Sequence, residues 1–79
     1  MWDILRSNDA VVINLAQAVL HDVGIDTFVA DLHMSMVEGS IGAFPRRLQV
    51  AAGDWAQARR MLGDAGLSAW LVAEEEAPA

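Results

Sequence analysis

Apolar and polar residues divide the first part of the chain into a strand, a helix and a second strand. The run Trp2 to Arg6 predicts a short strand, and Ser7-Asn8-Asp9 offers three consecutive residues suited to a helix N-cap. Apolar residues then recur at helical spacing, and Gly24 can end the helix in the left-handed conformation. The predicted apolar stripe consists of Val12, Leu15, Ala16, Val19, Leu20 and Val23. Residues 25–32 are rich in strand formers and predict a second strand.

The second part of the chain repeats this order after a connection of about a dozen residues. Residues 46–52 alternate between apolar and polar and predict a half-buried strand. A second helix is expected to follow a Gly53-Asp54 cap and to end at Gly66, and residues 67–73 predict a last strand. The apolar stripe of this helix consists of Trp55, Ala58, Met61, Leu62 and Ala65. The segment 74–79 has no apolar pattern and predicts an acidic, disordered tail.

The two parts also resemble each other in sequence. LHDVGIDTFVA from Leu20 aligns with LGDAGLSAWLV from Leu62, at a shift of 42 residues. Two strand–helix–strand units in one short chain predict an α+β fold, a ferredoxin-like βαββαβ sandwich with a four-stranded antiparallel sheet and two helices on one face. Residues 1–73 would form this single domain. Because Trp and Leu residues alternate onto both faces of the strands, we expect a homodimer that packs through sheet faces or edge strands.

Composition narrows the classes of function. The 79 residues include 54% hydrophobic and 20% charged residues, and no cysteine, which excludes disulfides and thiolate metal sites. Eleven acidic residues against five basic ones give a net charge of −6, which disfavours binding to nucleic acid and to anionic membranes. The start of the chain lacks the features of a signal peptide, and no apolar run reaches the length of a membrane span. We therefore expect a cytoplasmic protein.

Two stretches carry a resemblance to a known family. NDAVVINLAQAVLHDVGI and VADLHMSMVEGSIGAFPRRLQVAAGDWAQARRML resemble the bacterial family labelled putative prokaryotic signal-transducing protein, a domain of unknown function. The most specific parts are residues 30–35, the glycines at 39 and 42, and Pro45 to Leu48. The resemblance implies a fold like that of the nitrogen-regulatory signalling proteins, which bind small effectors and partner proteins. This chain lacks their long partner-binding loop and any lysine to hold nucleotide phosphates, so ATP binding is not expected.

The connection between the two halves, HMSMVEGSIGAFPRR, is the candidate site. Its glycines can present backbone N–H groups, and Arg46 and Arg47 can bind carboxylate or phosphate through two parallel hydrogen bonds. Its apolar residues are typical of a surface that contacts a partner. The candidate residues are His33, Met36, Glu38, Gly39, Gly42, Phe44, Arg46 and Arg47. The alternative is a long structural turn, in which one arginine faces water and the other pairs with Asp31 or Glu38.

Metal binding and catalysis are two further interpretations of this connection. A metal-handling protein would use His33, Asp31 and Glu38, with His21 or the adjacent methionines Met34 and Met36 as further ligands. An enzyme would place a general base at His33 or Glu38 and an electrophile at Arg46, but so small a domain leaves little volume for a closed pocket. We therefore expect a binding or signal-transducing module without catalytic activity or cofactor. It would contact an unknown partner protein or a small anionic ligand through residues 33–47.

Overall fold

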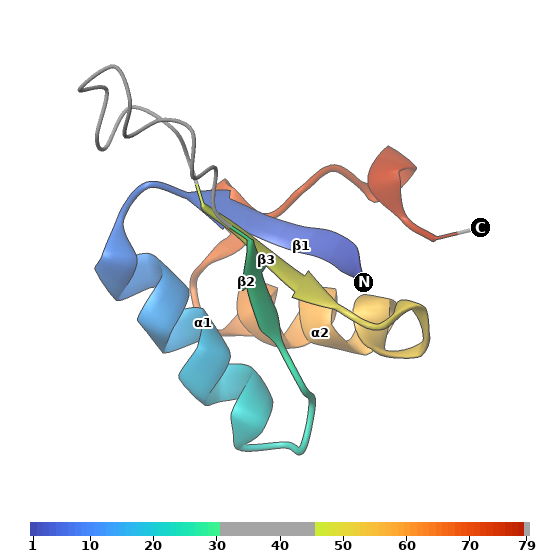
Figure 1. The fold of residues 1–79 in the computed structure, drawn as a ribbon, viewed down its shortest axis with the longest axis horizontal. Helices are drawn as coiled ribbons and strands as arrows, with labels where there is room; N and C mark the ends of the chain where they lie inside the picture. Colours follow the sequence, from blue (N-terminus) through green and yellow to red (C-terminus); the bar gives the residue numbers. More distant parts are fainter. Residues whose placement is uncertain (31–45, 79) are drawn as a thin grey trace.

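A computed structural model shows an α+β fold with a three-stranded antiparallel sheet and two α-helices (Figure 1). It describes residues 1–30 and 46–78. The strands lie in the order β1-β3-β2, so the strand that follows the connection occupies the centre of the sheet. The elements are β1 (Trp2–Ser7), α1 (Ala10–His21), β2 (Phe28–Ala30), β3 (Arg46–Val50) and α2 (Trp55–Asp64).

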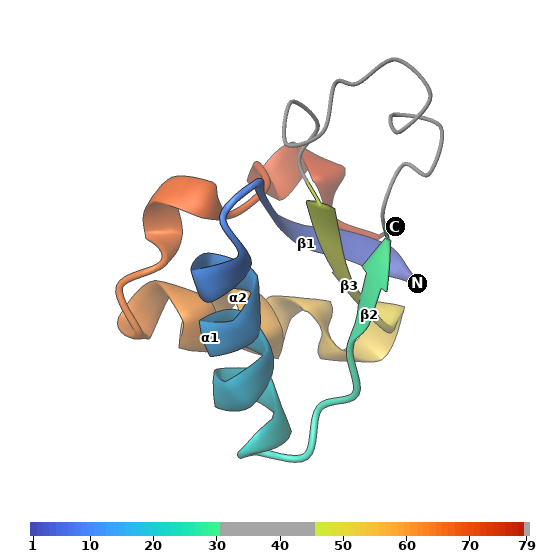
Figure 2. The same cartoon turned by 60° about the vertical axis from the view of Figure 1, so that its left-hand side comes forward.

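Both helices pack against one face of the sheet, and the core lies between the two layers (Figure 2). The central strand β3 places Leu48 and Val50 in this core, as the alternation of residues 46–52 predicts. In β1 the pairing with β3 shifts between Asp3 and Leu5, so that Ile4 and Leu5 are both fully buried. Burying a side chain of this size contributes about 1.5 to 3 kcal/mol, and these adjacent residues belong to the centre of the core.

Helix α1 begins where the sequence predicts but buries a rotated face. Asp9 is its N-cap, and the Asp9 side chain accepts a hydrogen bond of 2.9 Å from the backbone N–H of Val11. The buried residues of the helix are Val12, Ile13, Ala16 and Leu20. Leu15 and Val23, which we assigned to the apolar stripe, are 46% and 42% exposed. The assignment of Leu15 and Val23 was wrong: Ile13 is buried in place of Leu15, so the buried face is rotated about the helix axis relative to the predicted one.

The two helices end in the same way. Gly24 and Gly66 have φ angles of +81° and +88°, in the region that residues with a Cβ atom rarely adopt. After each glycine the next backbone N–H donates to a carbonyl five residues earlier, from Ile25 to Leu20 at 2.9 Å and from Leu67 to Leu62 at 3.0 Å. This is the Schellman motif. All four of these apolar residues are buried in the core, so each turn also fixes the packing of its helix.

Residues 67–73 do not form the fourth strand that we predicted. Ser68–Trp70 is a 3-10 turn, and only Leu71 forms an isolated antiparallel bridge, with Leu5. The N–H of Val72 also donates to the carbonyl of Ile4 at 3.1 Å, so this segment runs beside the edge of β1 for a short distance. The apolar residues of the segment do not alternate, which favours a turn over a pleated strand. Trp70 therefore lies in a turn and not on a sheet face.

Two further segments complete the described structure, β2 and the residues near the C-terminal end. Strand β2 includes Phe28–Ala30 of the predicted range 25–32, of which residues 31 and 32 lie outside the described residues. Glu74–Glu76 forms a 3-10 turn, and the Glu76 carboxylate contacts Arg6 of β1. In the described part of the chain, neither helix is long and apolar enough to cross a membrane.

Candidate functional site

Most of the predicted site lies outside the described residues. This holds for His33, Met36, Glu38, Gly39, Gly42 and Phe44, and also for the possible ligands Asp31 and Met34. The structure does place Arg46 and Arg47, the first two residues of β3. The geometry of the site is therefore built from these two arginines and the side chains around them.

The sheet register gathers basic residues at one end of β1 and β3. Arg6 lies opposite Arg47, and Ser7 lies opposite Arg46. Three of the five basic residues of the chain thus occupy neighbouring positions on two paired strands. This end of the sheet therefore holds most of the basic residues of a chain whose net charge is −6.

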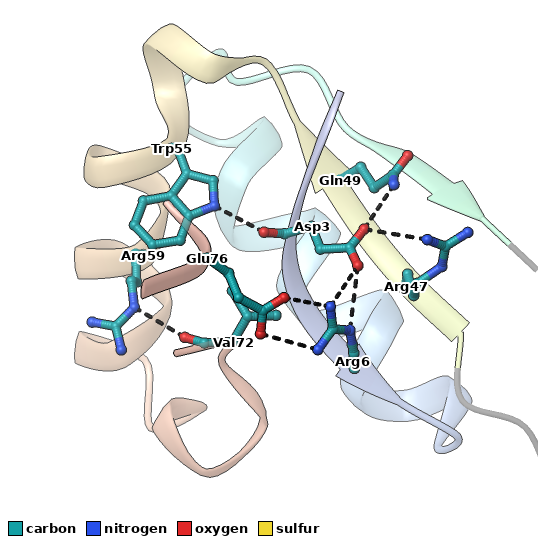
Figure 3. Close-up of polar contacts among 8 residues, drawn as sticks. All are labelled: Asp3, Arg6, Arg47, Gln49, Trp55, Arg59, Val72 and Glu76. Carbon is teal, nitrogen blue, oxygen red and sulfur yellow. Dashed lines mark hydrogen bonds and ion pairs between the residues drawn. The ribbon is translucent and has the colours of Figure 1, made fainter. Parts of the chain in front are cut away.

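The carboxylate of Asp3 lies at the centre of these side chains, on the face of the sheet opposite the helices (Figure 3). Gln49 donates a hydrogen bond of 2.7 Å to its Oδ1, and the Nη2 and Nε of Arg6 donate to its Oδ2 at 2.9 and 3.3 Å. The Nη1 of Arg47 is 3.8 Å from Oδ1. The Asp3 side chain is only 14% exposed, so this carboxylate exchanges most of its water contacts for protein donors.

A shift in strand pairing places Asp3 and Arg6 on the same face. Side chains three apart on a regular strand point to opposite faces of the sheet. The register shift between Asp3 and Leu5 adds one residue to β1, which returns Arg6 to the face of Asp3. Across the strand pair, Asp3 then lies opposite Gln49 and Arg6 opposite Arg47, which are two apart on β3 and share a face.

A second carboxylate reaches Arg6 from the far end of the chain. The Nη2 of Arg6 donates to Oε1 of Glu76 at 2.6 Å, and its Nη1 donates to Oε2 at 3.2 Å. Two parallel bonds of this kind are the preferred geometry of arginine with a carboxylate. Figure 3 shows the Arg6 guanidinium between Glu76 and Asp3. We refer to five residues as the open-face network: Asp3, Arg6, Arg47, Gln49 and Glu76.

The network changes the acidity of its two most contacted groups. Partial burial alone raises the pKa of Asp3, but the hydrogen bonds from Gln49 and Arg6, with the charges of Arg47 and Arg6, outweigh it. The pKa of Asp3 is therefore below its ordinary value. The hydrogen bonds of Arg6 to Glu76 and to Asp3 raise the pKa of the guanidinium further above its ordinary value. Asp3 and Arg6 are therefore both charged at neutral pH.

Helix α2 holds the backbone of the same strand. The Nε1 of Trp55 donates a hydrogen bond of 2.8 Å to the carbonyl oxygen of Asp3. The guanidinium of Arg59 lies 5.9 Å from the Trp55 ring, and its Nε donates to the carbonyl of Val72 at 3.3 Å. These contacts connect α2 to both β1 and the segment that leads to Glu76, so they position two members of the network.

Nothing in the described ranges supports the metal reading. Of its proposed ligands only His21 is described, and its Nε2 lies 3.1 Å from the hydroxyl of Thr27. Within residues 1–30 and 46–78, no three His, Asp or Glu side chains gather closely enough to hold a metal ion. His21 therefore makes a local hydrogen bond between α1 and the segment before β2.

The open-face network also bears on the expected homodimer. We based that expectation on apolar side chains covering the second face of the sheet. On β1 and β3 that face instead carries the charged and amide groups of the network, and Phe28, 55% exposed, lies opposite Gln49 on β2. The open face is therefore mixed, with charged and amide groups on β1 and β3 and an exposed Phe28 on β2, and the dimer stays a prediction.

Sequence reasoning missed Asp3, Arg6, Gln49 and Glu76 as members of the site. Asp3 and Arg6 are separated from Glu76 by about 70 residues, and no spacing in the sequence connects them. The one available signal was the position of Arg47 and Gln49 on the polar face of an alternating strand, which predicts that the two side chains share a face.

The fold and the network define a class: a small α+β domain whose open sheet face carries an ordered set of charges. Within that class the chain belongs to the family described as "putative prokaryotic signal transducing protein", whose model matches residues 1–66. No match to a curated protein was found.

Proposed function

We propose that this protein is a non-enzymatic binding module that contacts a partner protein or a small anionic ligand at the arginine-rich end of its sheet. Arg46 and Arg47, the described part of the predicted site 33–47, supply this surface together with Arg6. The observation that carries the proposal is the register that sets Arg6 opposite Arg47 and Arg46 opposite Ser7. The signal-transducing description of the family agrees with a role in binding.

Charge supports an anionic partner over a cationic one. The rest of this chain repels anions, so a cluster of arginines is the place where an anion gains most from contact. Arg47 is 41% exposed in its side chain and lies 3.8 Å from Asp3, a contact long enough to leave its donors accessible to a second acceptor. A carboxylate or phosphate could therefore bind Arg47 without breaking the Asp3 contacts of Arg6 and Gln49.

The lowered pKa of Asp3 makes this residue a poor general base. A general base works best when its pKa is near the working pH, because it must hold and release a proton. Its donors lower the pKa of Asp3 below the ordinary value, away from neutrality. Its role in the proposal is to orient Arg6 and Arg47.

Replacing the arginines tests the proposal. The variants are Arg47→Ala, alone and combined with Arg46→Ala, and the matched control is Arg60→Ala, which removes the same charge from an exposed position on α2. Thermal shifts would be measured with inorganic phosphate, small di- and tricarboxylates and nucleotides, and partner capture would be compared by affinity purification. We expect the wild type and Arg60→Ala to retain binding and the Arg47 variants to lose most of it.

Three results would contradict the proposal. One is an equal loss of binding in Arg60→Ala and Arg47→Ala, since a general charge effect would then account for it. The second is full retention of binding by the double variant. The third is a wild type that binds none of these anions or proteins.

A further inference from the structure

The Glu76 carboxylate binds the Arg6 guanidinium in the geometry expected of a carboxylate ligand. Its two carboxylate oxygens take the two terminal nitrogens of the guanidinium, at 2.6 and 3.2 Å, while Asp3 holds the same guanidinium from its Nε side. Arg6 is thus oriented by one carboxylate and bound by another. A site that accepts the chain's own carboxylate in this geometry has the shape and charge to accept a carboxylate from elsewhere.

The contact between Arg6 and Glu76 is exposed and can exchange. The two side chains are 41% and 40% exposed, and ion pairs at such positions are weak in water because solvent screens them. Asp3, by contrast, is mostly buried and has three neighbouring donors. Glu76 is therefore the partner of Arg6 that another carboxylate can replace, and Asp3 is the one that stays.

We propose that Arg6, with Arg47 beside it, is a binding site for an acidic peptide segment, and that Glu76 competes for this site as an internal ligand. The inference rests on the proposed function and names the class of its partner. It favours a peptide because the present occupant is a glutamate that follows two more, Glu74 and Glu75, in a short 3-10 turn. A partner segment rich in glutamate or aspartate would repeat this chemistry.

Competition has a measurable consequence. A ligand must displace Glu76 from Arg6. The apparent affinity is therefore the intrinsic affinity multiplied by the fraction of molecules in which Glu76 does not contact Arg6. For an exposed ion pair of ordinary strength, abolishing the competitor is expected to raise the affinity roughly two- to sixfold. Glu75 is the matched control, because it carries the same charge one residue away from the glutamate that binds Arg6.

The test uses a fluorescein-labelled, N-acetylated peptide of four glutamates, with a four-glutamine peptide as the uncharged control. Fluorescence anisotropy at low ionic strength would give Kd for the full chain and for Glu76→Gln, Glu75→Gln and Arg6→Gln. We expect Glu76→Gln to bind about two to six times more tightly than the wild type, Glu75→Gln to resemble the wild type, and Arg6→Gln to bind weakly.

Three outcomes would overturn the inference. Glu75→Gln could strengthen binding as much as Glu76→Gln, Glu76→Gln could leave Kd unchanged, or no variant could prefer the glutamate peptide to the glutamine peptide. Any of these leaves the proposed function standing if Arg47→Ala still loses an anion or partner that Arg60→Ala retains. If those two variants also behave alike, both proposals fail.

Discussion

At the scale of single residues, Asp3 organises the open face. Its backbone carbonyl accepts from Trp55 and its carboxylate accepts from Gln49 and Arg6, so the residue connects helix α2, strand β3 and the arginines. Hydrogen bonds that include a charged group are about twice as strong as neutral ones. Asp3 therefore contributes to stability as well as to the position of Arg6.

Replacing Asp3 by asparagine is expected to destabilise the protein in a pH-dependent way. The folded state lowers the pKa of Asp3, so its charge stabilises the fold above the ordinary carboxyl pKa and loses this effect as the pH falls through the lowered value. At pH 7 we expect Asp3→Asn to lower the free energy of unfolding by about 1 to 2 kcal/mol. The difference from wild type should shrink below about pH 4.

Urea unfolding at several pH values would measure this difference. Asp26→Asn is the control, because it removes the same charge from an exposed position outside the network. A loss of stability in Asp3→Asn that is constant from pH 7 to pH 2.5, or equal to that of Asp26→Asn, would contradict the account of Asp3.

At the scale of elements, the sequence predicted the starts and ends of the helices well because local chemistry sets them. The similarity between LHDVGI and LGDAGL comes from two Schellman motifs, with Gly24 and Gly66 at equivalent positions. Both glycines need a positive φ and both are followed by a buried aliphatic residue. The repeat thus marks two equivalent helix ends, but it does not extend to equivalent strands.

For a related reason, the sequence could not show that residues 67–73 form a turn and a single bridge in place of the predicted strand. Phe28–Ala30 follows Gly24 by a few residues and pairs with β3, whereas Ser68–Trp70 turns and leaves Leu71 to form a single bridge. Similar composition leads to different structures because pairing depends on what each segment meets in the fold. The rotation of α1 toward Ile13 has the same origin, since several apolar stripes were available on that helix.

The two helix caps differ in a way that mutation can test. Asp9 accepts a hydrogen bond from Val11, whereas Asp54, at the equivalent position of α2, makes no side-chain cap bond. Asp9→Ala is expected to cost about 1 kcal/mol of stability, and Asp54→Ala roughly half of that or less. Chemical denaturation of both variants gives the comparison. Equal costs would show that the Asp9 bond does not stabilise α1.

At the scale of the whole molecule, the sheet register brings three of the five basic residues to one end of β1 and β3. Three arginines meet on paired strands, and the acidic residue that binds Arg6 most closely comes from near the other end of the sequence. The sequence indicated Arg46 and Arg47 through their position at the start of a strand. It could not indicate Arg6 and Glu76, because the sheet register and a one-residue shift in β1 bring them into the site.

The most direct test of this account is to map the bound ligand on the protein. Nuclear magnetic resonance of the ¹⁵N-labelled chain would be followed during titration with inorganic phosphate and with the four-glutamate peptide, including the arginine Nε–Hε signals. The account predicts that at least one probe causes its largest shifts at Arg6 and Arg47 and at the amides of Asp3 and Gln49. Largest shifts along α1 or at Arg59 and Arg60 with both probes, or no shifts with either, would contradict it.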